Sequence, residues 1–312
     1  MNRAYWLLQR LMQLVPVLLG ISLICFALLQ MIPGDPARII LGSRASAEAV
    51  AAMRERLGLD QPALQQYLTY MGKVIRGDFG ESISYKVPVS DLIVEHAPVT
   101  GFLALYVIVL AVPVAVLLGV LAARYRGSWI DHLIRALSVL GMTIPVFWLA
   151  ILMLRFFSLE LGWFPVSGYG NGFFGHLNHL LLPAVSISIW VIPVLVRNLR
   201  ASIVQQSTAD YVLAGRAKGL TEQHIFTRHI LKNASLPTLN LFGVLVAYLV
   251  GGTIIVELIY GLPGLGLLMF NAILGRDYPI IQGLTLFYAL ATVAITLATD
   301  ILSGLIDPRV KT

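Results

Sequence analysis

Six long stretches of the chain carry no Asp, Glu, Lys or Arg, and polar segments separate them. The stretches are residues 11–34, 97–123, 136–154, 161–196, 233–256 and 278–299. A helix needs about 20 apolar residues to cross a bilayer, and a backbone surrounded by lipid must pair its own hydrogen-bonding groups. The pattern therefore predicts six membrane-spanning helices, with kinks at Pro145 and Pro193. The fourth stretch opens with turn-forming residues, "GWFPVSGYGNGFFGHLNH", which predicts that its helix starts near Leu180.

The first stretch follows Arg3 and Arg10 and in this respect resembles a secretory signal peptide. Its apolar run is longer than such a signal needs, and the following "MIPGDPARII" offers no clear small-residue cleavage site. We therefore expect this helix to be retained as a membrane span.

The polar segment 32–98 continues the helical pattern outside the spans. Ser46 is placed to cap a helix that ends at Gly58 and carries Val50, Met53 and Leu57 on one face.

A second helix of this segment is expected between an Asp60 cap and Gly77, with Pro62 in its first turn. Its apolar positions at helical spacing are Leu64, Tyr67, Leu68, Met71 and Ile75. Seven basic and eight acidic residues nearly cancel in charge. These two amphipathic helices either pack on the membrane bundle or receive a partner.

A polar, basic insert, "AGRAKGLTEQHIFTRHILKNASLP", separates the fourth and fifth spans. Thr221 can cap a short helix, with Leu220 and Ile225 spaced for a hydrophobic staple around the cap. Gly219 separates this helix from an earlier one at 209–218, in which Ala214, Gly215 and Ala217 are small. Ile225, Phe226, His229 and Ile230 form a stripe on the second helix, and Pro237 is placed to open the fifth span. The pattern fits a rigid bent unit with a docking face, and equally a solvated loop or helices packed under the bundle.

The composition supports a membrane protein, with 58% hydrophobic and only 12% charged residues, where soluble domains carry about 25% charged residues. The single cysteine, Cys25, excludes an internal disulfide framework. The net charge of +6 reflects membrane topology, since Lys and Arg concentrate on cytoplasmic segments. With both termini in the cytoplasm, the short outer loops near 158–180 and 261–277 hold only Arg276, and the polar insert faces the cytosol. A nucleic-acid footprint is not indicated.

Several motifs carry a resemblance to a known family. "RAKGL…RHILKNASLP" resembles the EAA loop of ABC importer permeases, which docks a membrane subunit onto its ATPase. The other motifs match the dipeptide/oligopeptide/nickel branch, in family order: "MIPGDPA", "LGLDQP", "GDFGESI", "LPAVS", "YGLPGLG" and "RDYPIIQ". The EAA pattern is altered, since Leu213 occupies the glutamate position, Ala214 and Gly215 follow it, and Leu236–Pro237 lies five residues further downstream than in maltose-type permeases.

The resemblance implies an all-α integral membrane protein with the type I ABC importer permease fold. Its expected parts are a cytoplasmic tail and first span (1–34), an extracytoplasmic helical subdomain (35–96), a permease domain (97–307) with a coupling loop at about 205–237, and a cytoplasmic tail (308–312). The implied location is a bacterial inner membrane. The implied partners are a second permease subunit, two ABC ATPase subunits that bind ATP and Mg, an extracytoplasmic solute-binding protein and membrane lipid.

Energy must come from such partners or from an ion gradient, because the chain has no "GxxxxGK[ST]" loop to cradle ATP. We expect no cofactor on this chain and no enzymatic activity of its own. The residues expected in the ATPase-coupling loop are Ala214, Gly215, Arg216, Ala217, Lys218, Gly219, Leu220, Thr221, Glu222, Ile225, Phe226 and His229.

Polar and small residues inside the spans are candidates to line a solute pathway. They are Thr143, Ser186, Ser188, Asn240, Thr253, Asn271, Thr285 and Thr292, although such residues are also common in helix–helix contacts. Glu257, close to the end of the fifth span, is either a gate or half of a structural pair with Arg276. Arg155 is expected to anchor the end of the third span, and Asp300 to snorkel or to pair with Arg309.

A metal site is not predicted, because His176 and His179 stand in a loop without a third ligand. The most specific interpretation is a permease subunit of an ATP-driven importer of di- and oligopeptides or peptide-like solutes. A nickel or nickel-chelate importer subunit, an ion-coupled carrier and a structural scaffold remain as alternatives. Neither "HExxH" nor "GxSxG" occurs, so metalloprotease and esterase sites of those types are not indicated.

Overall fold

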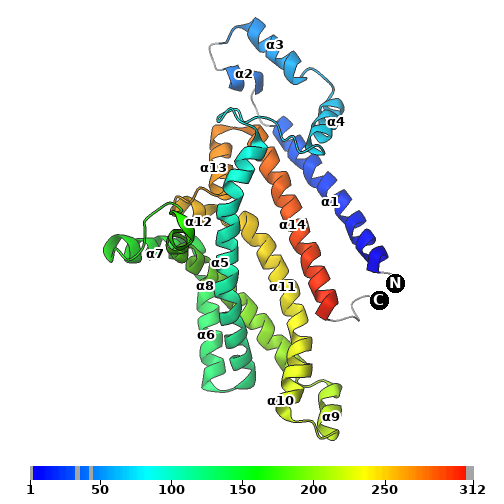
Figure 1. Ribbon diagram of the computed structural model, residues 1–312, viewed down its shortest axis with the longest axis vertical. Helices are drawn as coiled ribbons and strands as arrows, with labels where there is room; N and C mark the ends of the chain where they lie inside the picture. Colours follow the sequence, from blue (N-terminus) through cyan, green and yellow to red (C-terminus); the bar gives the residue numbers. More distant parts are fainter. Residues whose placement is uncertain (1–2, 32–35, 42–44, 307–312) are drawn as a thin grey trace. The chain divides into compact units, whose positions relative to one another are not determined.

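The computed structural model describes residues 3–31, 36–41 and 45–306. They form helices joined by short turns, and an isolated bridge pairs Glu81 with Pro88. The elements are α1 (Arg3–Met31), α2 (Pro36–Leu41), α3 (Ala47–Leu57), α4 (Ala63–Val74), α5 (Val89–Arg124), α6 (Trp129–Thr143), α7 (Val146–Met153), the π-helical η1 (Leu154–Glu160), α8 (Gly172–Gln206), α9 (Asp210–Ala217), α10 (Glu222–Ile225), the π-helical η2 (Phe226–Ile230), α11 (Leu231–Gly252), α12 (Ile254–Ile259), α13 (Leu265–Gly275) and α14 (Tyr278–Ile306) (Figure 1). The predicted boundary at Gly34 and the tail 308–312 lie outside the described residues.

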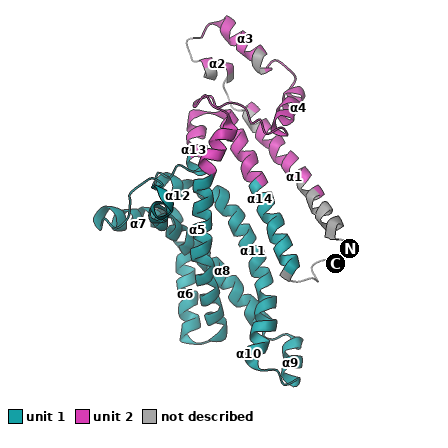
Figure 2. Cartoon of the chain, in the orientation of Figure 1, with its two compact units in different colours: residues 1–6, 98–267, 291–312 teal, residues 7–97, 268–290 magenta. Residues whose placement is uncertain are grey.

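The chain divides into two compact units (Figure 2). The first comprises Met1–Trp6, Pro98–Leu267 and Ala291–Thr312, and the second Leu7–Ala97 and Leu268–Leu290. Each is described by itself below.

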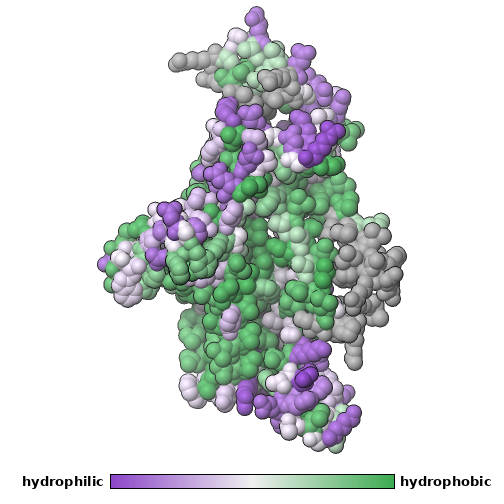
Figure 3. All heavy atoms as spheres, viewed as in Figure 1, coloured by the Kyte–Doolittle hydropathy of each residue, from purple (hydrophilic) through white to green (hydrophobic). Residues whose placement is uncertain are grey.

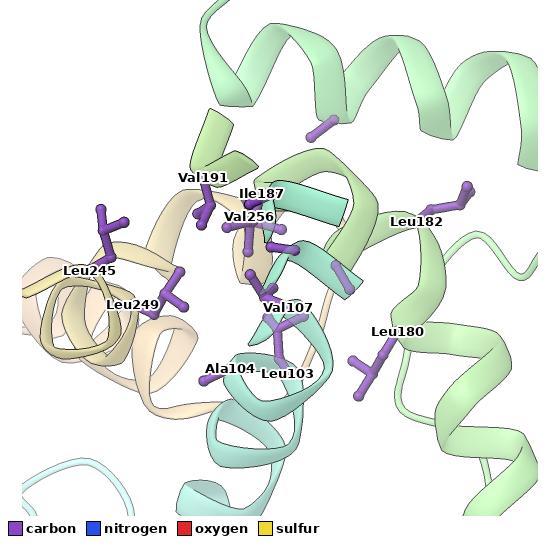
Figure 4. Close-up of a cluster of buried hydrophobic side chains, with 14 of the residues drawn as sticks. Leu103, Ala104, Val107, Leu180, Leu182, Ile187, Val191, Leu245, Leu249 and Val256 are labelled. Carbon is purple, nitrogen blue, oxygen red and sulfur yellow. The ribbon is translucent and has the colours of Figure 1, made fainter. Parts of the chain in front are cut away.

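The core of the first unit surrounds α8, which packs against α6, α7 and α11. Buried Leu103 and Val107 of α5 and Ile187 and Val191 of α8 belong to one hydrophobic cluster, together with Leu249 of α11 (Figure 4). Polar contacts join α11 to α8 and to α14: Thr238 donates a 3.0 Å hydrogen bond to Asn198, and Ser303 of α14 donates one of 2.9 Å to Asn240. The unit is therefore a helix bundle held by apolar packing and by a few polar links.

The predicted spans correspond to helices, with three differences in detail. Four helical runs are long and apolar enough to cross a membrane: α5, α8, the continuous run Glu222–Gly252 and α14. Helix α6 and the following α7–η1 form a fifth membrane-spanning candidate if the bent pair is taken as one span. The described apolar stretch of α1, Val15–Ala27, is shorter than these five candidates.

The first difference concerns α8, which begins at Gly172 and not near Leu180. The turn-forming residues end at Asn171. His179 lies within the helix, where its Nδ1 is 2.9 Å from the Gly175 carbonyl oxygen. The helix also continues through Pro183 and Pro193.

The second difference is at Pro145, where a bend of 92° separates α6 from the following helix. Ile144 adopts an extended conformation, with φ −75° and ψ 122°, as steric clash with a following proline favours. The predicted third span is thus two helices that meet almost at a right angle.

The third difference is that Pro237 does not open the fifth span. The helix runs without interruption from Glu222 to Gly252 and contains Pro237. The polar residues before it bond to their own helix, since Ser235 donates to the Lys232 carbonyl and Thr238 to the Ala234 carbonyl. The Ser and Thr side chains, whose presence in the sequence predicts a helix end, therefore form their hydrogen bonds with carbonyl groups of the same helix.

In the second unit, the predicted caps of α3 are confirmed. Ser46 accepts a hydrogen bond from the Ala49 amide, and Gly58 ends the helix at φ 68°. The predicted cap of α4 is wrong, because Pro62 occupies that position and Asp60 instead pairs with Arg54 at 3.1 Å.

The packing face of α4 also differs from the expected one. Tyr67 and Tyr70 lie against Phe26 of α1, with ring centroids 5.5 and 6.5 Å apart, and the Tyr67 hydroxyl lies 2.8 Å from that of Ser22. Leu64, Leu68 and Ile75 are exposed. The side of α4 that carries Tyr67 and Tyr70 is thus the side that packs against α1.

A buried ion pair fixes the start of α6 to α8. The guanidinium of Arg200 donates two 2.6 Å hydrogen bonds to the Asp131 carboxylate, which also accepts one of 3.0 Å from the Gly127 amide. The Asp131 side chain is 1% exposed and that of Arg200 20%. A bidentate guanidinium–carboxylate pair fixes orientation as well as distance.

We predict that Arg200→Met destabilises the protein by about 3 kcal/mol or more, because it leaves a buried carboxylate without its counter-charge. Thermal unfolding of the detergent-solubilised protein measures the effect as a lowered Tm. The double variant Asp131→Asn/Arg200→Met should recover much of that loss. Equal Tm values for the single variant and the unaltered protein would contradict this role.

Candidate functional site

The polar insert folds into the short helix α9 and, after a turn, the first part of the continuous helix Glu222–Gly252; we call residues 210–230 the elbow. It contains α9, α10 and η2. Gly219 adopts φ 78°, and the amides of Gly219 and Leu220 donate to the carbonyls of Arg216 and Gly215. This is the Schellman arrangement that ends a helix at a glycine, and it sets the turn between α9 and α10.

The start of α10 follows the predicted cap. The Thr221 side chain accepts a 3.3 Å hydrogen bond from the His224 amide. A Cβ atom placed on Gly215 would lie 3.4 Å from Ile225 and 3.7 Å from Leu220, so both residues of the predicted staple contact α9. Arg216 and Glu222 add a two-point ion pair of 2.7 and 3.1 Å across the turn, between exposed side chains.

The elbow is attached to the end of α8 by apolar packing. Ile225 and Ile230 are buried in one cluster with Leu199 and Ile203 of α8 and with Val212 of α9. The stripe expected to form a docking face is therefore largely used within the chain: Ile225 is 1% exposed, Phe226 is half-buried and His229 is exposed.

A different surface of the elbow is exposed in the described part of the chain. Leu213, Ala214 and Ala217 of α9 are exposed and share one helix face, while Val212 and Gly215 are buried on the other. Gly215 was expected to let an outside surface approach, but its missing side chain makes room for Ile225 instead. Arg216, Lys218, Gly219, Leu220, Thr221 and Glu222 are exposed. Figure 3 shows hydrophilic side chains gathered on the elbow and hydrophobic ones over α5 and α6.

A second polar centre of the first unit is built around Glu257 of α12, which is fully buried. Thr100 of α5 and Thr253 each donate a 2.8 Å hydrogen bond to Oε1. The amides of Gly266 and Leu267 donate to Oε2 at 2.7 and 3.1 Å. The carboxylate therefore binds the first-turn amides of α13, where a helix favours negative charge.

The glycines of the motif "YGLPGLG" leave room for the Glu257 side chain and for close backbone packing around it. A Cβ atom on Gly264 would lie 2.5 Å from Glu257 Oε2, and one on Gly266 would lie 2.7 Å from the Ile254 Cα. Thr100 also accepts a 2.9 Å hydrogen bond from the Leu265 amide. The sequence offered Arg276 as the partner of Glu257, but the structure assigns that role to two hydroxyls and two backbone amides.

Two further motifs meet in the second unit. Asp277 of "RDYPIIQ" is 1% exposed, and its Oδ2 accepts a 2.7 Å hydrogen bond from the Ser82 hydroxyl and one of 2.8 Å from the Ser84 amide. Ser82 belongs to "GDFGESI", so this carboxylate holds the loop before α5 against the turn before α14. Both motifs can be recognised in the amino-acid sequence, but their contact joins residues 193 and 195 positions apart and carries no local signal.

Of the pathway candidates, Thr253 and Glu257 come together in the first unit, where the Thr253 hydroxyl donates a 2.8 Å hydrogen bond to the Glu257 carboxylate. Ser186, Thr253 and Glu257 are buried, and Ser186 bonds to the Leu182 carbonyl at 2.8 Å. Thr143, Asn240, Asn271 and Thr292 are exposed, Thr285 is half-buried, and Ser188 is buried. The buried Ser186, Thr253 and Glu257 form hydrogen bonds within the first unit, and the buried Ser188 hydroxyl has no hydrogen-bond partner among the described residues.

The remaining predicted polar residues have local partners. Arg155 pairs with Glu160 at 3.0 Å, both exposed. The His176 ring stacks on Tyr169 with centroids 3.8 Å apart, and its Nδ1 lies 2.9 Å from the Tyr169 carbonyl oxygen. Within the described part of the chain, no three His, Cys, Asp or Glu side chains converge as metal ligands would. Arg309, the expected partner of Asp300, lies outside it.

Comparison with known proteins places these features in a family. Residues 115–312 match the family model "Binding-protein-dependent transport system inner membrane component". Residues 3–104 match the family model for the N-terminal part of binding-protein-dependent transport system membrane components. A putative peptide transport system permease protein of Brucella abortus (strain 2308) is 40% identical over 308 residues, 98% of both chains. Glutathione transport system permease protein GsiC of Escherichia coli (strain K12) is 36% identical over 306 residues, again 98% of both chains.

The fold has counterparts among solved structures. A chain of the inward-facing MetNI methionine ABC transporter aligns with a TM-score of 0.54 and 18% identity, covering 69% of this chain and 96% of that one. This likeness concerns the fold alone.

We predict that Glu257→Ala lowers the Tm strongly, because two amides and two hydroxyls lose their acceptor at a cost of about 1–3 kcal/mol for each unsatisfied buried group. Glu257→Gln should cost less, since its carbonyl oxygen can receive the amides while Thr100 and Thr253 rotate to accept from its NH2 group. Thermal unfolding in detergent compares the two. An Ala variant as stable as the Gln variant would contradict the arrangement.

We also predict opposite effects of two Gly→Ala changes. Gly266→Ala should destabilise the protein, because the new Cβ meets the Ile254 backbone at 2.7 Å. Gly251→Ala, where nothing lies within 4 Å, should be neutral or stabilise helix α11 by up to about 1 kcal/mol. The same unfolding assay decides, and equal shifts for both variants would refute the close approach at Gly266.

Proposed function

The chain belongs to the binding-protein-dependent transport system inner membrane components, the permeases of ABC importers, and from this premise we propose that it forms a translocation pathway for di- and oligopeptides or peptide-like solutes. A second permease subunit completes the pathway, two ABC ATPases supply the energy, and an extracytoplasmic binding protein delivers the solute. The relatives named for peptide and glutathione transport favour peptide-like solutes over the nickel that the sequence left open. Membership of this family of binding-protein-dependent permeases argues against the alternative of an ion-coupled carrier.

The elbow is the part of this chain that we assign to the ATPase. The observation that carries the assignment is the exposed stripe of Leu213, Ala214 and Ala217 on a helix otherwise fixed to its own chain. Two alanines let another surface approach the α9 backbone closely, and Leu213 offers an apolar side chain that is 61% exposed. A cleft of an ATPase subunit is the occupant we propose for this stripe.

Packed side chains would transmit a motion of the ATPase from the elbow to the membrane helices. The elbow is fixed to α8 by Ile225 and Ile230, and α8 packs on α6, α7 and α11. A shift of the elbow would therefore move α8 as a lever between two arrangements of the bundle, with nucleotide on the ATPase biasing the equilibrium. This mechanism requires the elbow and both termini to lie in the cytoplasm, as the distribution of Lys and Arg indicates.

We predict that Ala214→Trp abolishes coupling and leaves the chain folded in the membrane. The indole would hold the ATPase surface away from α9, while the buried contacts of Val212, Gly215 and Ile225 stay intact. Co-purification of the ATPase subunits should fall at least tenfold, and ATP-driven uptake of a labelled dipeptide by proteoliposomes of the assembled importer should stop.

Ala214→Ser is the matched control, because it keeps a small side chain at the same exposed position, and it should behave as the unaltered protein. Uptake at the normal rate by the Trp variant would remove this stripe from the coupling surface.

A further inference from the structure

We propose that α7 and η1, residues Val146–Glu160, do not cross the membrane but lie along its plane, in the leaflet farther from the elbow, with their outward side chains against lipid acyl chains. The proposal does not depend on which solute is carried or on where the ATPase binds. It requires only that the chain is embedded in a bilayer.

The first argument is the geometry of the break at Pro145. Helix α6 has 15 residues, which at 1.5 Å per residue is about 22 Å, less than the roughly 30 Å of a bilayer's hydrocarbon core. The next helix leaves at 92°, so it adds almost no height along the direction of α6. Figure 1 shows α7 running across the direction of α5 and α6.

The backbone makes this change of direction feasible inside a membrane. Pro145 has no amide hydrogen to leave unpaired. The Ile144 amide still donates to the Leu140 carbonyl, and the Pro145 carbonyl accepts from the Leu149 amide. The residues on both sides of the break therefore keep the hydrogen bonds that close the last turn of α6 and the first turn of α7.

The second argument is how the side chains divide between the two faces of this helix. The small residues Ala150 and Ser158 are buried and face the protein: the Ala150 carbonyl accepts a 3.1 Å hydrogen bond from the Tyr260 hydroxyl, and Ser158 donates one of 3.2 Å to the Pro165 carbonyl. Apart from Arg155 and Glu160, the exposed side chains of this segment are large and apolar. They are Phe147, Trp148, Ile151, Leu152, Phe156 and Leu159, with 38–63% of their surface accessible.

This division favours lipid over the second permease subunit as the occupant. Helix–helix contacts in membranes are enriched in small residues that let backbones approach, and here the small residues face inward. Tryptophan is typical of the interface between lipid and water, and both Trp148 and Trp163 are exposed. The exposed Arg155–Glu160 pair can reach the headgroups while its methylene groups remain in the apolar layer.

The test measures the membrane depth of spin labels in the assembled importer, reconstituted in liposomes. Cys25 is the only cysteine, so Cys25→Ser provides a cysteine-free background. Single cysteines then replace Trp148, Leu152 and Phe156, which are exposed and four residues apart, and the control helix α5 is labelled at Leu105 and Val109. Relative access of oxygen and a water-soluble nickel chelate reports the depth of each label.

We expect the three labels of α7 and η1 to lie at one depth within about 4 Å, with high access to oxygen. The two α5 labels should differ by about 6 Å, the rise of four residues in a crossing helix. A steady change of about 6 Å per step along α7 and η1 would overturn the proposal, as would low access to both reagents, which indicates cover by another subunit. A second set at Phe147 and Ile151 decides the question if a variant of the first set fails to assemble.

Discussion

A backbone amide or carbonyl away from water must find a partner within the protein, and this constraint shapes three of the described helix breaks. At the turn from α12 to α13, the Glu257 carboxylate and the Thr100 hydroxyl accept hydrogen bonds from three consecutive amides. At the turn before α14, the Asp277 carboxylate accepts from the Ser84 amide. At Pro145 the residue itself removes the donor. The breaks are therefore specific chemical arrangements, and the helices between them need little beyond apolar side chains.

The same constraint explains why acidic residues are buried in so apolar a chain. Asp131, Glu257 and Asp277 are each at most 1% exposed, and each accepts hydrogen bonds from at least two groups. Asp131 accepts from a guanidinium and an amide, Glu257 from two hydroxyls and two amides, and Asp277 from a hydroxyl and two amides. A buried carboxylate with several hydrogen bonds is retained because removing it would leave those donors unpaired. We therefore regard these three acids as elements that join helices and turns.

The elbow combines the short helix α9 with the beginning of the continuous helix Glu222–Gly252. Its rigidity comes from a glycine turn, a threonine cap, a two-point ion pair and the packing of Ile225 on Gly215. The exposed ion pair contributes little alone, typically below about 1 kcal/mol. The buried contacts with α8 matter more, since they connect the exposed stripe of α9 to the helix at the centre of the bundle.

Features that depend on local composition could be predicted from the amino-acid sequence. Charge-free runs predicted long apolar helices, Ser46, Gly58, Gly219 and Thr221 predicted helix ends, and the ordered motifs indicated the family. The buried side of each helix follows from tertiary packing: Ile225 turns inward, Tyr67 and not Leu64 packs on α1, and Glu257 binds the turn that follows it. The tertiary structure also decided that Pro145 divides a span while Pro183, Pro193 and Pro237 do not. Local propensity and hydropathy act within a few residues, whereas the direction of a helix and the partner of a buried charge are set by groups more than 60 residues away, such as Arg200 for Asp131 and Thr100 for Glu257.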